Sequence, residues 1–219
     1  MPRLLFKKVG NAAWISHLDL MRLFQRAFKR AGLHLTHTQG YNPRPSVSIA
    51  LPLSVGVESC CELLDFELEG DRVSCREIQE RLNHTLVAGI SVLDVYDNGR
   101  KLRDLTLLHS TIHLEYNTGV PYDTNTVLTE LFASEKLTVM KRTKNGMQEQ
   151  DIIPMIHRIS VTQVGEKEVT LDLLACCQNP TLNPMHLVTA IHSYAPQFAP
   201  DFAKIIRNEI YDAQETVFR

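Results

Sequence analysis

The sequence lacks the signals of several large protein classes. It has no run of about 20 consecutive apolar residues, the length that a membrane-spanning helix needs. Its N-terminus has too short an apolar stretch for a signal peptide. The glycine motifs that bind phosphates and dinucleotides are missing, and so is the G-x-S-x-G nucleophile motif. These absences predict a soluble protein of the cytoplasm and leave its reaction, if it has one, undefined.

Metal-binding patterns are also scarce. No C-x-x-C spacing occurs, and the odd number of cysteines makes a poor disulfide framework; they are Cys60, Cys61, Cys75, Cys176 and Cys177. In strands the two members of a vicinal pair face opposite sides, so one of each pair is expected in the core. His34 and His37 are three apart in an extended segment, which also predicts opposite faces. We therefore expect no metal and no cofactor.

What the sequence does contain is a globular composition with an uneven distribution of charge. Hydrophobic residues make up 44% and charged residues 22% of 219 residues, which allows one large domain or two small ones. Residues 1–50 hold eight basic residues and one acid, whereas residues 51–100 hold four basic residues and ten acids. Either the basic segment faces an anionic partner, or the two segments pair with each other.

Hydrophobic periodicity and turn residues predict the elements of both halves. In the first half we expect a strand over 3–9, a helix over 18–31 between Ser16 and Gly32, strands over 47–53 and 61–68, a helix capped by Ser74 or Asp71 with apolar positions 78, 82, 86 and 87, and a strand over 91–96. In the second half we expect strands over 107–116 and 137–142, a turn at 144–146, a helical turn at 151–156, strands over 158–164, 169–176 and 205–211, and helices over 124–133 and 184–194.

The element order β-α-β-β-α-β in residues 1–98 is that of the ferredoxin-like fold, and residues 104–219 repeat it less cleanly. The turn Asp97–Arg100 marks the boundary. We therefore predict an α+β protein of two tandem ferredoxin-like halves, with the functional site in the first.

The first predicted helix concentrates positive charge. Arg22, Arg26, Lys29 and Arg30 recur at helical spacing on the side opposite its apolar stripe. The preceding strand adds Arg3, Lys7 and Lys8, so Lys8 is included in the candidate surface. Such a ridge can neutralise RNA phosphates, although a solvated helix face gives the same pattern.

Two shorter segments complete the candidate site. Ser16 is a good helix N-cap and Asp19 completes a capping-box-like arrangement, which leaves His17 as the residue without a structural explanation. His17 is a weak catalytic candidate. The loop Gly40–Pro45 is stiffened by two prolines and presents Tyr41, Asn42 and Arg44, a ring, an amide and a guanidinium suited to a nucleotide. Trp14 is expected in the core or at a hinge.

These segments carry a resemblance to a known family. The runs Lys8-Val9-Gly10, Trp14–Asp19, Arg26-Ala27, Gly40–Pro45 and Ala50–Gly56 resemble the signature of an uncharacterised bacterial family that is linked to radical SAM proteins. The loop departs from the common family form at Tyr41 and Arg44, which stand where Phe and often His occur. The chain resembles the stand-alone form, and the resemblance implies a separate radical SAM enzyme as the partner.

Three hypotheses follow from the sequence. The first is an accessory protein without catalytic activity that binds RNA or presents a substrate to a radical SAM enzyme. The second, by fold analogy alone, is a metal-independent RNA-processing endonuclease with His17 as general base. The third is a structural protein–protein partner that binds no nucleic acid.

Overall fold

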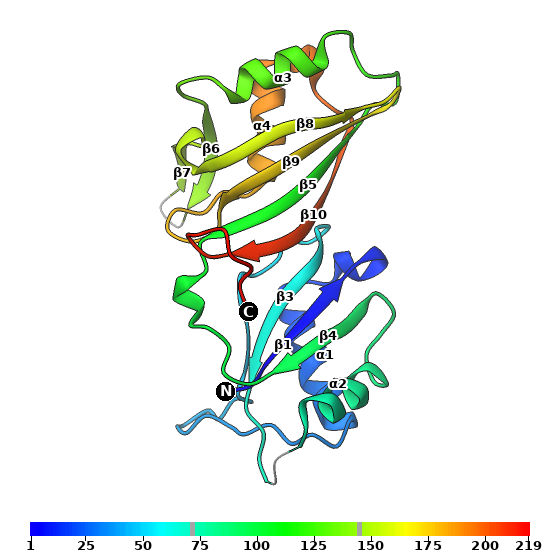
Figure 1. The fold of residues 1–219 in the computed structure, drawn as a ribbon, viewed down its shortest axis with the longest axis vertical. Helices are drawn as coiled ribbons and strands as arrows, with labels where there is room; N and C mark the ends of the chain where they lie inside the picture. The colour runs from blue at the N-terminus through cyan, green and yellow to red at the C-terminus, as the bar shows by residue number, and fades with distance from the viewer. Residues whose placement is uncertain (71–72, 144–145) are drawn as a thin grey trace. The chain divides into compact units, whose positions relative to one another are not determined.

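The computed structural model describes residues 1–70, 73–143 and 146–219 of the chain (Figure 1). Its contacts divide the chain into two compact units. The first unit comprises Met1–Asp104 together with Arg219, and the second comprises Leu105–Phe218. Each unit combines helices with a β-sheet, so the protein is of the α+β type.

The first unit has the element order that the sequence predicts. Its elements are β1 (Arg3–Lys8), the short 3-10 helix η1 (Gly10–Trp14), α1 (His17–Arg30), β2 (Val47–Ile49), β3 (Glu58–Phe66), α2 (Cys75–Asn83), β4 (Ile90–Tyr96) and η2 (Leu102–Asp104). β2 is shorter than the strand expected over 47–53, and β3 begins three residues earlier than expected. α2 ends at Asn83, before the apolar pair that was assigned to it.

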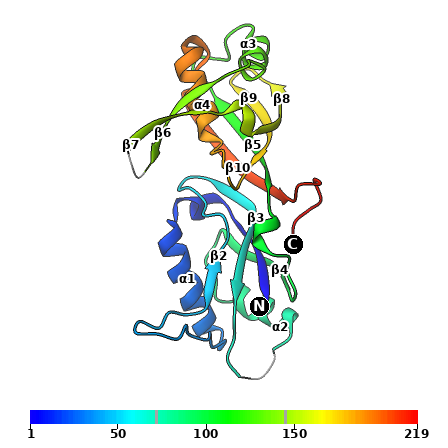
Figure 2. The same ribbon diagram turned by 90° about the vertical axis from the view of Figure 1, so that its left-hand side faces the viewer.

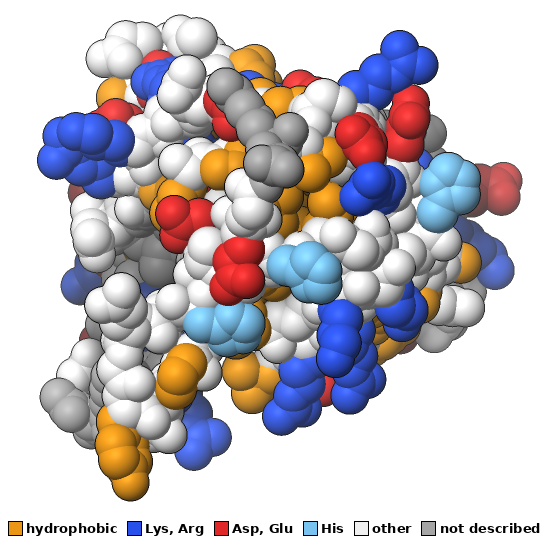
Figure 3. Space-filling model, turned by 90° about the horizontal axis from the view of Figure 1, so that it is seen from below, with side chains coloured by type: hydrophobic (Ala, Val, Ile, Leu, Met, Phe, Trp, Pro, Cys, Tyr) orange, Lys and Arg blue, Asp and Glu red, His pale blue; other side chains and the backbone are white. Residues whose placement is uncertain are grey.

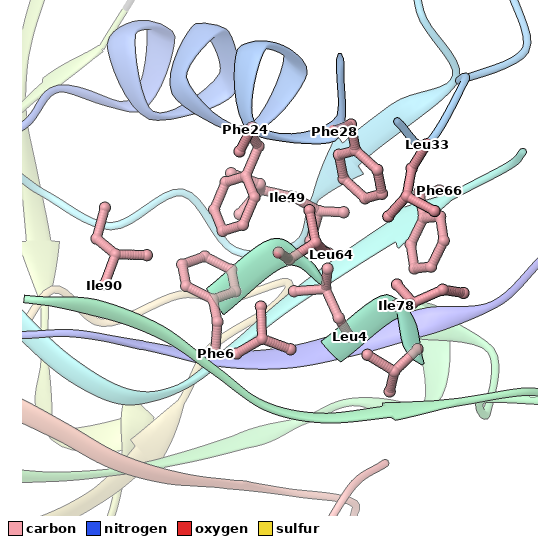
Figure 4. Close-up of a cluster of buried hydrophobic side chains, with 14 of the residues drawn as sticks. Leu4, Phe6, Phe24, Phe28, Leu33, Ile49, Leu64, Phe66, Ile78 and Ile90 are labelled. Atoms are coloured by element: carbon pink, nitrogen blue, oxygen red, sulfur yellow. The ribbon is translucent and has the colours of Figure 1, made fainter. Parts of the chain in front are cut away.

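The strands of the first unit lie in the order β4-β1-β3-β2, and each neighbouring pair is antiparallel. α1 and α2 cover one face of this sheet. Their apolar stripes meet the alternate side chains of β1 and β3, as expected for a sheet with one covered face. Phe24 and Phe28 of α1 point at this face (Figure 4). The ring of Phe24 contacts Phe6 edge-on with centroids 4.8 Å apart, and Phe28 lies 5.0 Å from Phe66.

The second unit has an additional hairpin. Its elements are β5 (Leu107–Glu115), α3 (Thr124–Phe132), β6 (Thr138–Thr143), β7 (Gly146–Asp151), η3 (Ile153–Met155), β8 (Ile156–Val164), β9 (Glu168–Cys176), α4 (Met185–Tyr194), η4 (Pro196–Phe198) and β10 (Phe202–Tyr211). The main strands follow the order β10-β5-β9-β8, and all of these pairs are antiparallel.

The hairpin of the second unit was predicted in part. The strand predicted at 137–142 is present as β6, which pairs with β7 in a separate two-stranded sheet. β7 itself was not predicted, because the sequence Gln148-Glu149-Gln150 has no apolar alternation. The strand predicted at 158–164 is present as β8, at the edge of the main sheet.

The structure also describes the N-cap of α2 and the two vicinal cysteine pairs. Ser74, and not Asp71, is described as the N-cap of α2: its side chain accepts a hydrogen bond from the Glu77 amide, while Asp71 lies outside the described residues. Of the turn expected at 144–146, residues 144 and 145 also lie outside the described residues, and Gly146 begins β7. Both vicinal cysteine pairs are split as expected, with Cys61 and Cys177 buried and their neighbours more exposed. None of the described helices has the length and apolar character that crossing a membrane requires.

Candidate nucleotide-binding site

The segment after α1 forms a hairpin loop over residues 36–46. The Thr38 amide donates to the Arg44 carbonyl at 2.8 Å, and the Ser46 amide donates to the Thr36 carbonyl at 2.7 Å. The Thr36 amide in turn bonds the Glu67 carbonyl just after β3, at 2.9 Å. The base of the loop is therefore fixed to the sheet, and the tip extends past the C-terminal end of α1 (Figure 2).

The tip of this loop presents the predicted ligand-binding groups to solvent. Tyr41 is fully exposed, and Asn42 and Arg44 are exposed beside it. A fully exposed tyrosine ring on an anchored loop is available for stacking, because nothing in the fold occupies its faces. Tyr41, Asn42 and Arg44 thus remain candidates for binding.

The N-terminus of α1 is capped as the sequence predicts. The Asp19 amide donates to Ser16 Oγ at 3.2 Å, and the Ser16 hydroxyl donates to Asp19 Oδ2 at 2.7 Å. This bond, followed by the ion pair with Arg22, holds the pKa of Asp19 below its ordinary value. The His17 ring makes no hydrogen bond to any residue that the structure describes, so no partner is seen to activate it.

The four basic residues of α1 do not form one uniform ridge. Arg22 pairs with Asp19 at 3.1 Å, and Arg30 Nη2 donates to the Thr85 carbonyl at 2.6 Å. Arg30 therefore links α1 to the segment after α2. Arg26 and Lys29 are exposed, and among the described residues neither has an acid within ion-pair distance. These two supply the positive charge that an anion could use.

Arg26 and Lys29 line a pocket of about 410 Å³, which we call the α1 pocket. The residues after the helix supply the remaining walls: His34, His37 and Pro45 from the hairpin segment, and Glu69 from beyond β3. The buried side chains of Leu33 and Leu35 form its apolar floor. Figure 3 shows a face of the molecule on which histidines lie beside Lys and Arg side chains, with acidic side chains next to them. The pocket volume is in the range that binds small ligands, about 300–1,000 Å³.

The α1 pocket holds both acidic and basic side chains. The Glu69 carboxylate lies 3.9 Å from His37 Nδ1, beyond hydrogen-bond distance, and both side chains are about half exposed. The Glu69 amide donates to the His34 carbonyl at 2.8 Å, which fixes the backbone of one wall against the other. The expectation that His34 and His37 face opposite sides was wrong, because the segment is not a regular strand and both line this pocket.

The basic residues of β1 are not on this surface. Lys8 is 1% exposed, and its ammonium group donates to the Ala13 carbonyl at 2.9 Å. Arg3 is 4% exposed and forms an ion pair with Asp65 at 2.6 Å. Including Lys8 among the RNA-binding residues was therefore wrong, since a side chain inside the fold cannot reach a phosphate. Part of the positive charge of residues 1–50 is therefore paired with acids of the same unit, as Arg3 is with Asp65.

Trp14 is exposed, so the first of its two expected places, the core, was wrong. Its side chain is 65% exposed, and its ring lies against Gly56, where an added Cβ would meet Trp14 Cζ3 at 3.3 Å. The Gly56 amide donates to the Ala13 carbonyl at 2.9 Å, which ties the 51–57 loop to η1. Val55 of this loop and Leu18 of α1 are also more than half exposed. The result is exposed apolar surface near the start of α1.

A family profile matches residues 2–184 of this sequence, most of its length. The family, designated DUF2344, is described as uncharacterized protein conserved in bacteria. This chain belongs to that family. The matched residues include α1, the hairpin loop and Glu69, so the α1 pocket lies wholly within the family region. No curated protein matches the chain.

Solved structures provide similarity at the level of the fold. A chain of a Cbf5-Nop10-Gar1 complex matches 95% of this chain over 48% of its own length, with 10% identity and a TM-score of 0.51. A chain in an H/ACA RNP bound to a substrate RNA containing 2'-deoxyuridine matches 94% of this chain over 46% of its own, with 9% identity and a TM-score of 0.49. This family member thus spans about half the length of the structures it matches, and the first likeness indicates a shared fold alone.

Proposed function

We propose that this protein is an accessory RNA-binding protein whose binding surface is formed by the α1 pocket and the tip of the hairpin loop. The observation that carries the proposal is that the α1 pocket, which holds the cations Arg26 and Lys29, is also lined by Pro45 of the hairpin loop. The tip of that loop carries the fully exposed aromatic ring of Tyr41. Cationic side chains bind the phosphates of a single strand, and aromatic rings stack on its bases.

The hairpin loop and the helix give these groups different tasks. Arg26 and Lys29 supply charge without sequence preference, because they meet phosphates as simple cations. Tyr41, Asn42 and Arg44 supply stacking and hydrogen bonds at a position fixed by the base of the loop. Catalysis receives less support, since His17 has no described partner that would orient it as a general base.

The proposal extends to the architecture and the partner. We propose that both units are ferredoxin-like, because their strands follow the same order once the β6–β7 hairpin is set aside. The first domain, about residues 1–98, would hold the site. The sequence resemblance supports a separate radical SAM enzyme as the protein that receives the bound RNA. The likeness to a chain of a Cbf5-Nop10-Gar1 complex is compatible with RNA, although a shared fold does not define function.

The test is binding of a fluorescent single-stranded RNA, followed by anisotropy between low and high salt. Affinity should fall steeply with salt, because neutralised phosphates release counterions. Arg26→Glu should weaken binding about 10-fold and flatten the salt dependence. Tyr41→Ala should weaken it about 5- to 100-fold by removing one stacked base. The matched control is Lys136→Glu, which makes the same charge change at an exposed site of the second unit.

Two results would contradict the proposal. One is binding that does not change with salt, and the other is an equal loss for Arg26→Glu and Lys136→Glu. Gel analysis of the RNA after incubation separates the endonuclease alternative: shortened RNA that depends on His17 would favour it. Purification from the native cell would test the partner, because a radical SAM protein should be retained.

A protein-docking role is the second candidate, supported by the exposed apolar surface around Trp14. Large apolar side chains gathered near one place mark surfaces that bind proteins more often than chance. Trp14→Ser and Leu18→Ser should then abolish retention of a protein partner while RNA affinity stays unchanged. If neither variant alters what is retained, this candidate fails.

A further inference from the structure

The α1 pocket contains an acid, Glu69, among cations. Its side chain is about half exposed, and its carboxylate forms a loose ion pair with His37 Nδ1, at 3.9 Å. A carboxylate in an anion-binding pocket opposes the binding of phosphate alone. It becomes favourable if the ligand brings hydrogen-bond donors to it, because an ionised carboxylate can only accept.

We propose that the α1 pocket binds one guanine nucleotide of a single-stranded RNA, with Glu69 accepting hydrogen bonds from the base and Arg26 and Lys29 contacting a phosphate. The inference rests on the proposed RNA-binding function and names the nucleotide that it selects. Guanine presents two adjacent donors, N1–H and the N2 amino group, which match the two oxygens of one carboxylate. Adenine and cytosine each present one amino group, and uracil turns carbonyl oxygens toward the acid.

The floor and size of the α1 pocket fit the same ligand. Leu33 and Leu35 are buried beneath the opening, so a planar ring above them loses water on an apolar surface. His34 and His37 add imidazole faces on which a base can stack. A volume of about 410 Å³ holds a single nucleotide and excludes a duplex. The base must therefore be unpaired, which leaves its Watson–Crick edge open to Glu69.

The test compares GMP, UMP, guanosine and the pentanucleotides UUGUU and UUUUU by NMR titration of the full chain. GMP should bind at least about 10-fold more tightly than UMP, as one bidentate contact allows. GMP should also bind more tightly than guanosine, because Arg26 and Lys29 contact its phosphate. UUGUU should bind more tightly than both GMP and UUUUU, since the hairpin tip can contact nucleotides that flank the guanine.

The isosteric variant Glu69→Gln isolates the acid. It should reduce the preference for UUGUU over UUUUU to about 2-fold or less, while Glu135→Gln, the same change at an exposed acid of the second unit, should keep the preference. An unchanged preference in Glu69→Gln would overturn the inference, and so would tighter binding of GMP than of UUGUU, which would indicate a free nucleotide as ligand. If both pentanucleotides bind equally and with steep salt dependence, RNA binding stands and guanine selection fails. If neither binds, the proposed function itself fails.

Discussion

The two units carry the same strand order but very different helix surfaces. The first helix of unit one, α1, holds four basic residues, whereas the corresponding helix of unit two, α3, holds a single charged residue, Glu130. α4 likewise carries no Lys or Arg. The same strand order thus occurs in both units, while the cationic residues of the described helices are concentrated on α1, so surface charge varies independently of topology.

In the main sheet of the second unit, histidines are hydrogen-bonded to acids, unlike His37 of the α1 pocket. His109 lies 2.6 Å from Asp172, and His113 lies 3.0 Å from Glu168, so histidines and acids from neighbouring strands are paired with each other. In the α1 pocket the corresponding groups, His37 Nδ1 and the Glu69 carboxylate, lie 3.9 Å apart, within ion-pair distance but beyond hydrogen-bond distance. Groups that are already hydrogen-bonded to each other bind further ligands weakly, so we expect the looser pair of the first unit to be the more available one.

The largest expected effect concerns the two cores. Phe24→Ala should lower the stability of the first unit by about 3–5 kcal/mol, because it empties a fully buried site and removes the contact with Phe6. Phe132→Ala in α3 should cost less, since this residue is 6% exposed and therefore buries less apolar area than Phe24. Urea unfolding followed by circular dichroism measures both. An equal loss of unfolding free energy in the two variants would contradict the prediction that Phe24 contributes more to stability than Phe132.

The helix starts provide a smaller contrast. Ser16→Ala should destabilise the protein by about 1 kcal/mol, because the Asp19 amide loses its acceptor. In α3 the N-cap Asp123 makes no capping bond and has a φ of 64°. Asp123→Gly should therefore stabilise the protein by about 0.5 kcal/mol by relieving a left-handed conformation. Thermal unfolding of both variants measures these changes in stability. A loss of stability in Asp123→Gly would contradict the prediction and show that the Asp123 side chain stabilises the fold.

The smallest effects are in the titration of two surface acids. The pKa of Asp19 is lowered by Ser16 and then by Arg22, and the pKa of Glu168 is lowered mainly by its bond to His113. Both acids are stabilising above their unfolded pKa, and that contribution disappears as the pH falls through the lowered folded pKa. NMR titration should show that Ser16→Ala raises the pKa of Asp19 more than Arg22→Gln does. His113→Ala should raise only the pKa of Glu168, and a change at Asp19 would contradict independent sites.

The sequence predicted those parts of the fold that local pattern defines. α1 begins after Ser16 and ends before Gly32. Gly32 has a φ of 68°, a left-handed conformation that glycine adopts at lower cost than a residue with a side chain. The element order of residues 1–98 followed from alternation and turns. β7 was not predicted because its residues Gln148 to Asp151 are all polar, so no hydrophobic periodicity distinguished the strand from a loop.

The site was predicted only in part, since pockets are formed by residues far apart in the chain. Lys29 was seen as part of a ridge, but Glu69 lies 40 positions later and no spacing relates the two. The misplacement of Lys8 could have been avoided. It shares strand parity with Leu4 and Phe6, and alternation places all three on the buried face.

The anchored base of the hairpin loop has a consequence for the kinetics of binding. A loop that is ordered before the ligand arrives loses little conformational freedom on association, so a slow folding step need not follow encounter. Backbone bonds from Thr36, Thr38 and Ser46 hold the base of this loop in place. RNA should thus associate in a single phase whose observed rate rises linearly with RNA concentration, and differences among ligands should be found in how long each one stays bound.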